Sequence, residues 1–175
     1  MTTRAVEALA RAGAREVWLG VESGSQKILD AMDKGTTVEA ARVATGILQA
    51  HGIKACWFIQ LGYPSEDWDD LIATRDLIRG SAPDEIGVSV AYPLPGTEFH
   101  ERVRAQLGRQ RNWKDTSDLA MLFQGTYDTA LYRKVRDLLH REVDNGSADD
   151  AAWDRLEADV HLHRSPSPSS LAIRA

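Results

Sequence analysis

Residues 16–26, EVWLGVESGSQ, run from an apolar segment into a carboxylate at Glu22 and then into a Ser-Gly-Ser turn. This pattern predicts a buried β-strand over 17–21 whose C-terminal end presents Glu22. Ligands of parallel α/β proteins bind at that end of the strands, and glycine lets a backbone approach closely. We therefore interpret Glu22 and Ser23 as candidate binding residues. The alternative is a glutamate that caps the next helix or faces solvent.

Two further apolar segments, 53–61 and 86–92, alternate with sequence of helical period. This alternation predicts βαβ units and a parallel sheet, so the fold class is α/β. Helices are expected over 4–12, 25–32, 38–50 and after Ser65, with Thr36 and Ser65 as N-caps. The alternation of strands and helices stops at the proline-rich turn 93–97. The helical spacing of apolar residues over 113–143 predicts helices packed on the domain.

Three regions follow from these patterns. Residues 1–105 are expected to form the α/β unit, and residues 106–145 a helical C-terminal extension. A turn is expected at 144–147, and residues 146–175 are expected to hold a short helix over 151–160 and a disordered tail that is rich in serine and proline.

Composition narrows the function classes. The 175 residues carry a net charge of −5, which argues against a nucleic-acid partner, and the basic run at 102–111 is interpreted as a solvated helix end. No apolar stretch approaches the ~20 residues of a membrane span, and the N-terminus lacks the apolar core of a signal peptide. A cytoplasmic protein without a membrane partner is the expectation.

Cys56 is the single cysteine, so this polypeptide can build neither an intrachain disulfide nor a thiolate metal cage. Its apolar surroundings predict a small buried residue rather than a reactive thiol. His161 and His163 are two positions apart, which places them on different faces of a helix and argues against a metal pair. The sequence therefore predicts no metal ligands and no catalytic residue.

All three predicted strands end in polar or glycine-bearing segments, and in a right-handed βαβ series such ends lie side by side. We predict a common rim on which Glu22 supplies a carboxylate, Gln60 an amide and Gly62 a close backbone approach. Lys34 would lie just above it, in the crossover after the first strand. A small, partly charged ligand suits this rim. The alternative is that these are only turn residues.

At this point the sequence resembles a known family. The segment 16–26, together with ILDAMDKG at 28–35, QLGYPSE at 60–66 and SVAYPLPGTEF at 89–99, resembles the C-terminal half of the core of radical S-adenosylmethionine (SAM) enzymes. It is most similar to the branch whose members often carry a cobalamin-binding domain. The resemblance covers about residues 3–105 and implies half of a partial TIM-type (βα) barrel, with three parallel strands followed by the helical extension.

The resemblance also implies roles for the rim residues. Glu22, with Ser23, would position SAM through its polar edges, and Lys34 would meet the methionyl carboxylate in a charge-assisted contact. The residues implied on the adenine side are Gln60, Gly62, Val90 and Tyr92.

One departure from the family is informative. The CxxxCxxC motif that holds the [4Fe-4S] cluster is absent, and one cysteine cannot ligate that cluster. We therefore expect a fragment of a radical SAM enzyme, inactive alone, with cluster ligands in a missing N-terminal half and cobalamin in the full-length parent as a further expectation. Its expected partners are a small-molecule substrate and either the missing half or another copy of itself. The alternative is a non-catalytic half-barrel that binds a partner chain or a nucleotide-like ligand.

Overall fold

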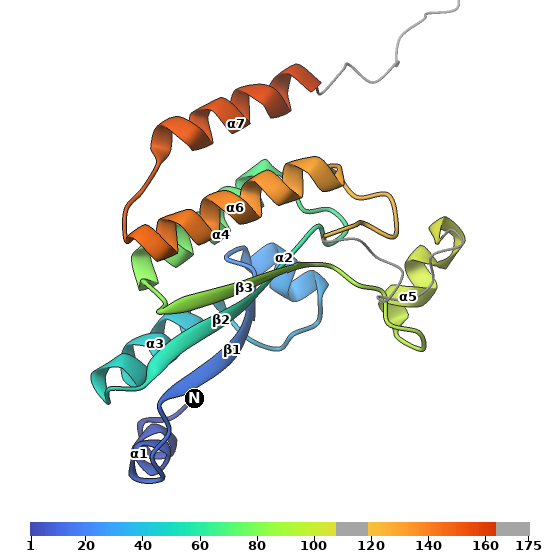
Figure 1. Ribbon diagram of the computed structural model, residues 1–175. Helices are drawn as coiled ribbons and strands as arrows, with labels where there is room; N and C mark the ends of the chain where they lie inside the picture. Colours follow the sequence, from blue (N-terminus) through green and yellow to red (C-terminus); the bar gives the residue numbers. More distant parts are fainter. Residues whose placement is uncertain (108–118, 164–175) are drawn as a thin grey trace, which may run out of the picture.

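The structure is a computed structural model that describes residues 1–107 and 119–163. A three-stranded parallel sheet in the order β1-β2-β3 lies at its centre (Figure 1). The strands are β1 (Glu16–Glu22), β2 (Lys54–Leu61) and β3 (Glu85–Val90). The predicted α/β class and the parallel sheet are therefore confirmed.

The helices follow the expected alternation with the strands. In chain order they are α1 (Thr3–Arg11), α2 (Gln26–Ala31), α3 (Val38–Ala50), α4 (Trp68–Ser81), α5 (Glu98–Val103) with a 3₁₀ turn at Arg104–Gln106, α6 (Thr129–Asn145) and α7 (Asp150–His163). None of the described helices is both long enough and apolar enough to cross a membrane.

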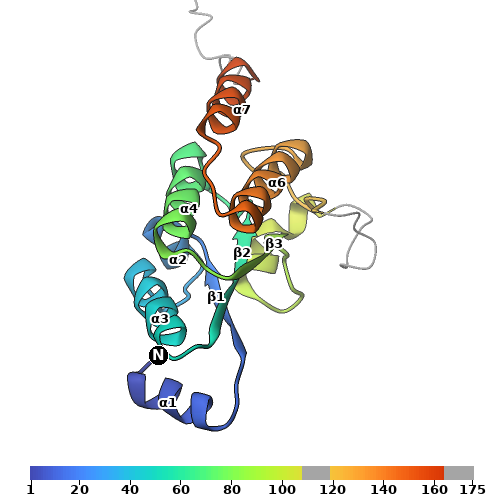
Figure 2. The same cartoon turned by 60° about the vertical axis from the view of Figure 1, so that its left-hand side comes forward.

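One face of the sheet carries the helices. Helix α3 packs on β1 and β2, α4 lies against α3, and α6 contacts both α4 and β3 (Figure 2). Alternate residues of β2 supply the core on this side, because Trp57, Ile59 and Leu61 are each at most 1% exposed. Phe58 points to the opposite face and is 50% exposed, so the described residues leave that face partly open.

The register of the sheet changes at the end of β1. Gly20 pairs with Phe58, but Glu22 pairs with Ile59, so the chain skips one residue between them. Glu22 also has a φ of +66°, which is uncommon for a residue with a side chain. Such irregularities re-aim side chains, and here the change falls on the carboxylate that the sequence singles out.

Both predicted N-caps are wrong. Thr37 rather than Thr36 caps α3, because its hydroxyl accepts the Ala40 N–H at 3.1 Å. Asp67 rather than Ser65 caps α4 in a reciprocal box, in which each of the Asp67 and Asp70 carboxylates accepts the other's backbone N–H. Ser65 instead takes a left-handed conformation with φ +73° in the turn before the helix.

Three element boundaries also differ from the prediction. Strand β3 ends at Val90 rather than residue 92, since the last backbone bond to β2 is from the Ala91 N–H to the Leu61 carbonyl, at 2.7 Å. Residues 119–128 precede α6 without helix, so part of the helical prediction for 113–143 is wrong. Helix α6 continues to Asn145 and ends at left-handed Gly146, so the predicted turn begins later. Trp113 and the tail after residue 163 lie outside the described residues.

Candidate functional site

The C-terminal ends of the three strands lie side by side, as the parallel order requires. Glu22 pairs with Ile59, Gln60 with Ser89 and Leu61 with Val90. We call the predicted residues at this edge, Glu22, Gln60, Gly62, Val90 and Tyr92, the strand-end rim. Val90 is the last residue of β3, and Tyr92 lies half-buried just beyond it.

The structure brings Lys34 to the strand-end rim. Its ammonium lies 2.7 Å from Oε1 of Glu22, and the two side chains are 39% and 13% exposed. The Glu22 carboxylate bends back over β1, because a Cβ added to Gly20 would lie only 3.2 Å from the same oxygen. A larger residue at 20 would therefore press on the carboxylate that pairs with Lys34.

Gln26 closes the loop that carries Lys34. Its side-chain amide donates to the Thr36 carbonyl at 3.1 Å, and its Oε1 accepts the Val38 N–H at 3.1 Å. These two bonds tie the start of α2 to the start of α3. Nothing in the sequence marks Gln26 for this role, because an amide becomes a loop clamp only when the chain returns to it ten residues later.

The small residues after Glu22 pack against helix α4. The Gly24 N–H donates to Oγ1 of Thr74 at 2.9 Å, and the Ser23 hydroxyl lies 3.3 Å from the same oxygen. Ser23 is only 1% exposed, so its hydroxyl lies on the helix side of the turn. Because residue 24 is glycine, the turn can approach the backbone of Ala73 closely. Contact of Ser23 with a ligand stays a prediction.

Helix α2 is fixed to α4 by a buried carboxylate that the sequence reasoning missed. Asp70 is 6% exposed and accepts the Ser25 hydroxyl at 2.6 Å. Lys27 adds ion pairs to Asp70 at 2.6 Å and to Asp67 at 2.9 Å. Hydrogen bonds to these two carboxylates, Asp70 first, raise the pKa of the Lys27 ammonium.

A second missed carboxylate lies beneath Gly62. The Gly62 N–H donates to Oε2 of Glu66 at 2.6 Å, and Glu66 is 0% exposed. Burial raises the pKa of Glu66 to about 8. Gly62 needs its glycine, since its φ is +77° and a Cβ would lie 2.9 Å from Met121. The spacing of four residues between Gly62 and Glu66 is the only signal that the sequence offers.

The open face of the sheet, on which Phe58 lies, extends from the strand-end rim toward the N-terminal ends of the strands. Gln60 lies on it two residues after Phe58, whose ring stacks on Trp18 with the centroids 4.7 Å apart. Gly20 and Gly87 flank Phe58 in the register of the sheet. Cys56 is fully buried, so the prediction of a small buried residue is confirmed, and burial raises the pKa of its thiol.

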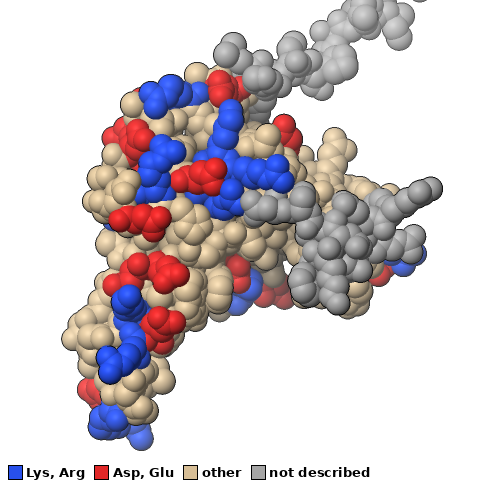
Figure 3. Space-filling model, viewed as in Figure 1, with Lys and Arg blue, Asp and Glu red and all other residues tan. Residues whose placement is uncertain are grey.

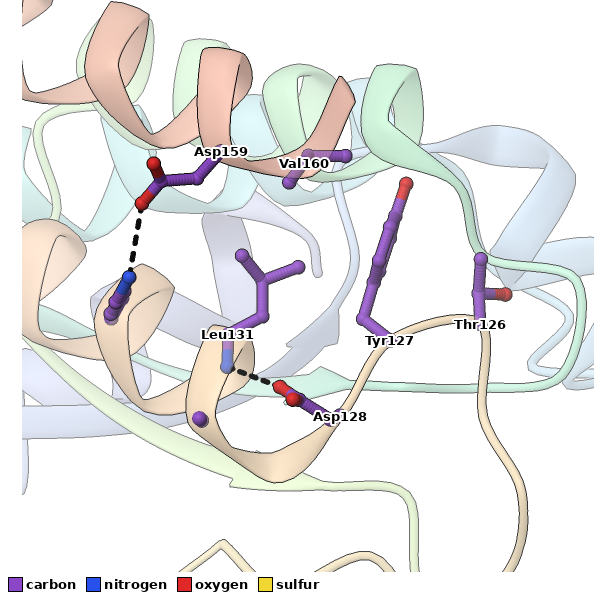
Figure 4. A pocket seen from close by; sticks show the side chains of 8 residues that line it. Thr126, Tyr127, Asp128, Leu131, Asp159 and Val160 are labelled. Carbon is purple, nitrogen blue, oxygen red and sulfur yellow. Dashed lines mark hydrogen bonds and ion pairs between the residues drawn. The ribbon is translucent and has the colours of Figure 1, made fainter. Parts of the chain in front are cut away.

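Two further features of the described surface lie away from the strand-end rim. Lys and Arg over α6 are interspersed with Asp (Figure 3), as in the pair of Lys134 with Asp159 at 3.1 Å. A hollow of about 420 Å³ lies between the start of α6 and the C-terminal part of α7. Tyr127, Leu131 and Val160 line it (Figure 4). No rim residue lines this hollow. Within 1–107 and 119–163, no three His, Cys, Asp or Glu side chains form a group that could hold a metal.

The fold and the rim define the class: an α/β protein with a parallel sheet whose strand ends carry a carboxylate, an ammonium and an amide. In sequence, the chain is 38% identical over 87 residues to the "Putative methylthiotransferase" of Methanocaldococcus jannaschii. It is 28% identical over 112 residues to an "Uncharacterized methyltransferase" of Pyrococcus horikoshii, and 27% identical over 88 residues to an uncharacterized M. jannaschii protein.

These similarities cover a small part of each relative. The matched segments are 50%, 63% and 49% of this chain but only 19%, 24% and 27% of the three relatives. The chain thus spans about a fifth to a quarter of the length of the curated relatives it matches. No family model matches the chain.

Proposed function

We propose that this chain forms one wall of the SAM pocket of a radical SAM enzyme. Two kinds of sequence similarity support the proposal. Methylthiotransferases are a radical SAM family, and a protein so named is 38% identical to half of this chain. The motifs within residues 16–99 resemble the same superfamily. The observation that carries the proposal is the ion pair of Lys34 with Glu22 at the strand-end rim.

The rim has the chemistry that SAM requires. Lys34 offers an ammonium to the methionyl carboxylate, and such contacts are short and strong when water is excluded. Glu22 accepts hydrogen bonds from hydroxyl or ammonium donors, and Gln60 can donate or accept. Because Lys34 and Glu22 lie 2.7 Å apart without a ligand, a ligand that carries both an anionic group and a donor can insert between them without leaving either charge unpaired.

The residues of this chain do not fit the [4Fe-4S] cluster. Its single cysteine is fully buried within β2, whereas a cluster of this kind needs three thiolates. In the proposal, the cluster and any cobalamin are therefore held by residues other than these 175. What this chain contributes is binding and orientation of the cofactor and substrate.

The open face of the sheet supports the half-barrel part of the proposal. In a TIM-type barrel the face opposite the helices points inward and is filled by side chains from other strands. Phe58 and Trp18 form an apolar stack on that face, and β1 and β3 are the outer strands of the described sheet. Further βα units that continue from these strands would cover the stack and close the pocket over the strand-end rim.

Direct binding of SAM tests the proposal. Isothermal titration of the 175-residue chain should show SAM binding that Lys34→Ala weakens about ten- to a hundredfold, the loss expected for one charge-assisted contact. Lys54→Ala is the matched control, because Lys54 is an exposed lysine at the opposite end of β2, and should leave the affinity unchanged. Equal affinities of the two variants would contradict the proposed role of this rim.

Reading the coding sequence on both sides of the segment for these residues provides a second test. An in-frame CxxxCxxC motif would support the radical SAM proposal. Its absence from both sides would favour the second candidate function, a non-catalytic half-barrel that binds a partner chain or a nucleotide-like ligand. The exposed Phe58 ring is the observation that favours this second candidate.

A further inference from the structure

Glu66 is a buried carboxyl group that is hydrogen-bonded on one side only. Its Oε2 accepts the Gly62 N–H at 2.6 Å, while its Oε1 has no hydrogen-bond partner among the described residues. The side chain is 0% exposed. A carboxylate in such a place loses its hydration without gaining a cation, whereas a neutral carboxylic acid loses far less.

The charged groups around Glu66 do not compensate for its burial. Lys27 of α2 is the cation whose charge reaches Glu66, but it is already paired with Asp67 and Asp70. The negative charges of Asp67 and Asp70, at the start of α4, disfavour ionisation of Glu66 further. On the side of α6, Tyr132 faces Glu66 and is fully buried, and burial followed by the charge of Glu66 raises the pKa of its phenol. Burial, opposed in part by the Gly62 N–H, raises the pKa of Glu66 to about 8.

Gly62 connects this carboxyl group to the C-terminal helices. A Cβ at Gly62 would lie 2.9 Å from Met121 and 3.2 Å from the Tyr132 ring, so the backbone at the end of β2 lies directly against the segment around α6. Glu66 holds the same backbone through the hydrogen bond that it accepts from the Gly62 N–H. The position of the turn after β2 therefore depends on both contacts.

We propose that Glu66 is a positioning residue, which holds the Gly62 turn against α6 while it is an uncharged carboxylic acid; when the proton leaves, the buried charge without a cation draws the carboxylate toward water, and the turn moves with it. The turn is part of the strand-end rim, so its movement changes the shape of the rim. The proposal concerns the turn itself and stands whether or not the rim binds SAM.

The proton on Glu66 links folding to pH. In the unfolded chain Glu66 has its ordinary pKa of about 4.5, whereas in the folded chain the pKa is about 8. As the pH rises from 5 to 8, the unfolded chain has lost this proton while the folded chain still holds it. The contribution of Glu66 to the free energy of unfolding is therefore fully present below about pH 4.5 and falls as the pH rises to about 8.

Glu66→Gln is the diagnostic variant, because glutamine keeps the shape and the acceptor of the neutral acid but cannot ionise. Urea unfolding should be measured between pH 5 and 9. Between pH 6 and 7 the wild-type unfolding constant should rise up to about tenfold more per pH unit than that of Glu66→Gln, which is the linkage of one proton. Glu98→Gln removes an exposed carboxyl group on α5, away from the Gly62 turn, and should follow the wild-type slope. Equal slopes for the wild type and Glu66→Gln would overturn the proposal.

Two measurements on the wild type keep the test valid if Glu66→Gln does not fold. The infrared carbonyl band of a buried protonated carboxylic acid should be present at pH 6 and lost above pH 8. The hydrogen-exchange protection of the Gly62 amide should fall over the same range, beyond the change in intrinsic exchange. Absence of the band at pH 6, or protection that does not change through pH 9, would also overturn the proposal.

Discussion

Gly24 lies so close to helix α4 that a Cβ at this position would be 2.4 Å from the carbonyl oxygen of Ala73. The contact joins residues about fifty positions apart, and it sets how closely the turn after Glu22 approaches the helix. Backbone atoms line this contact, so they cannot move aside as the end of a flexible side chain can.

Gly24→Ala should therefore destabilise the protein by about 3 kcal/mol, as overpacking against a rigid neighbour does. Gly80→Ala is the matched control, because a Cβ at this helical glycine meets nothing within 4 Å. It should stabilise α4 by about 0.5 to 1 kcal/mol. Urea unfolding followed by circular dichroism measures both changes, and equal effects would contradict the close approach at Gly24.

Arg79 and Glu142 join α4 to α6 through a two-bond ion pair, and Glu142 also accepts the indole N–H of Trp153 at 3.0 Å. The Glu142 side chain is only 4% exposed, so Arg79→Leu would leave a buried carboxylate without its cation. We expect a loss of about 3 kcal/mol in the free energy of unfolding. Lys134→Met breaks the exposed pair with Asp159 and should cost less than about 1 kcal/mol.

The same pair predicts acid sensitivity. Burial alone would raise the pKa of Glu142, but hydrogen bonds from Arg79 and from the Asp149 N–H hold it below the ordinary value. Stability from this group is present above the unfolded pKa of about 4.5 and is lost as the pH falls through the lower folded value. The wild type should therefore lose more stability between pH 5 and 3 than Glu142→Gln does. Parallel curves for the two proteins would refute this linkage.

Loss of the Lys34 ion pair should affect binding far more than folding. The lysine side chain is 39% exposed, and pairs of this kind contribute at most about 1 kcal/mol. Lys34→Ala should thus unfold within about 1 kcal/mol of the wild type in urea. A larger loss would mean that weak SAM binding by this variant reports unfolding rather than the loss of a ligand contact.

The open sheet face should make the chain self-associate. Phe58 is 50% exposed on the sheet face that the described residues leave partly open, and its strand lies between two outer strands, which favours pairing with another copy or another half-barrel. Sedimentation velocity should show species larger than a monomer at high concentration for the wild type, and mainly monomer for Phe58→Ser. Ser89→Ala, at an exposed site on β3, is the control. A wild type that stays monomeric would contradict association through this face.

Much of the fold could be predicted from the sequence because its signals are local. Apolar segments of strand length alternate with helical periodicity, and this pattern alone predicts a parallel sheet with aligned strand ends. The same reasoning placed Glu22 and Gln60 at one edge, where the register of the strands now puts them. The N-caps could not be chosen in this way, because Thr36 and Thr37, or Ser65 and Asp67, are chemically similar neighbours and the entry angle of the chain selects between them.

The sequence by itself determined the order of strands and helices and the residues at the strand ends, because those depend on periodicity and on chain connectivity. Only the tertiary structure decided which of these residues meet. The pairing of Lys34 with Glu22, the contact of Gly24 with α4 and the burial of Glu66 beside α6 each depend on elements that pack together across long stretches of chain. Packing of this kind sets distances to a few tenths of an ångström and decides whether a carboxylate remains charged, and no local pattern encodes either result.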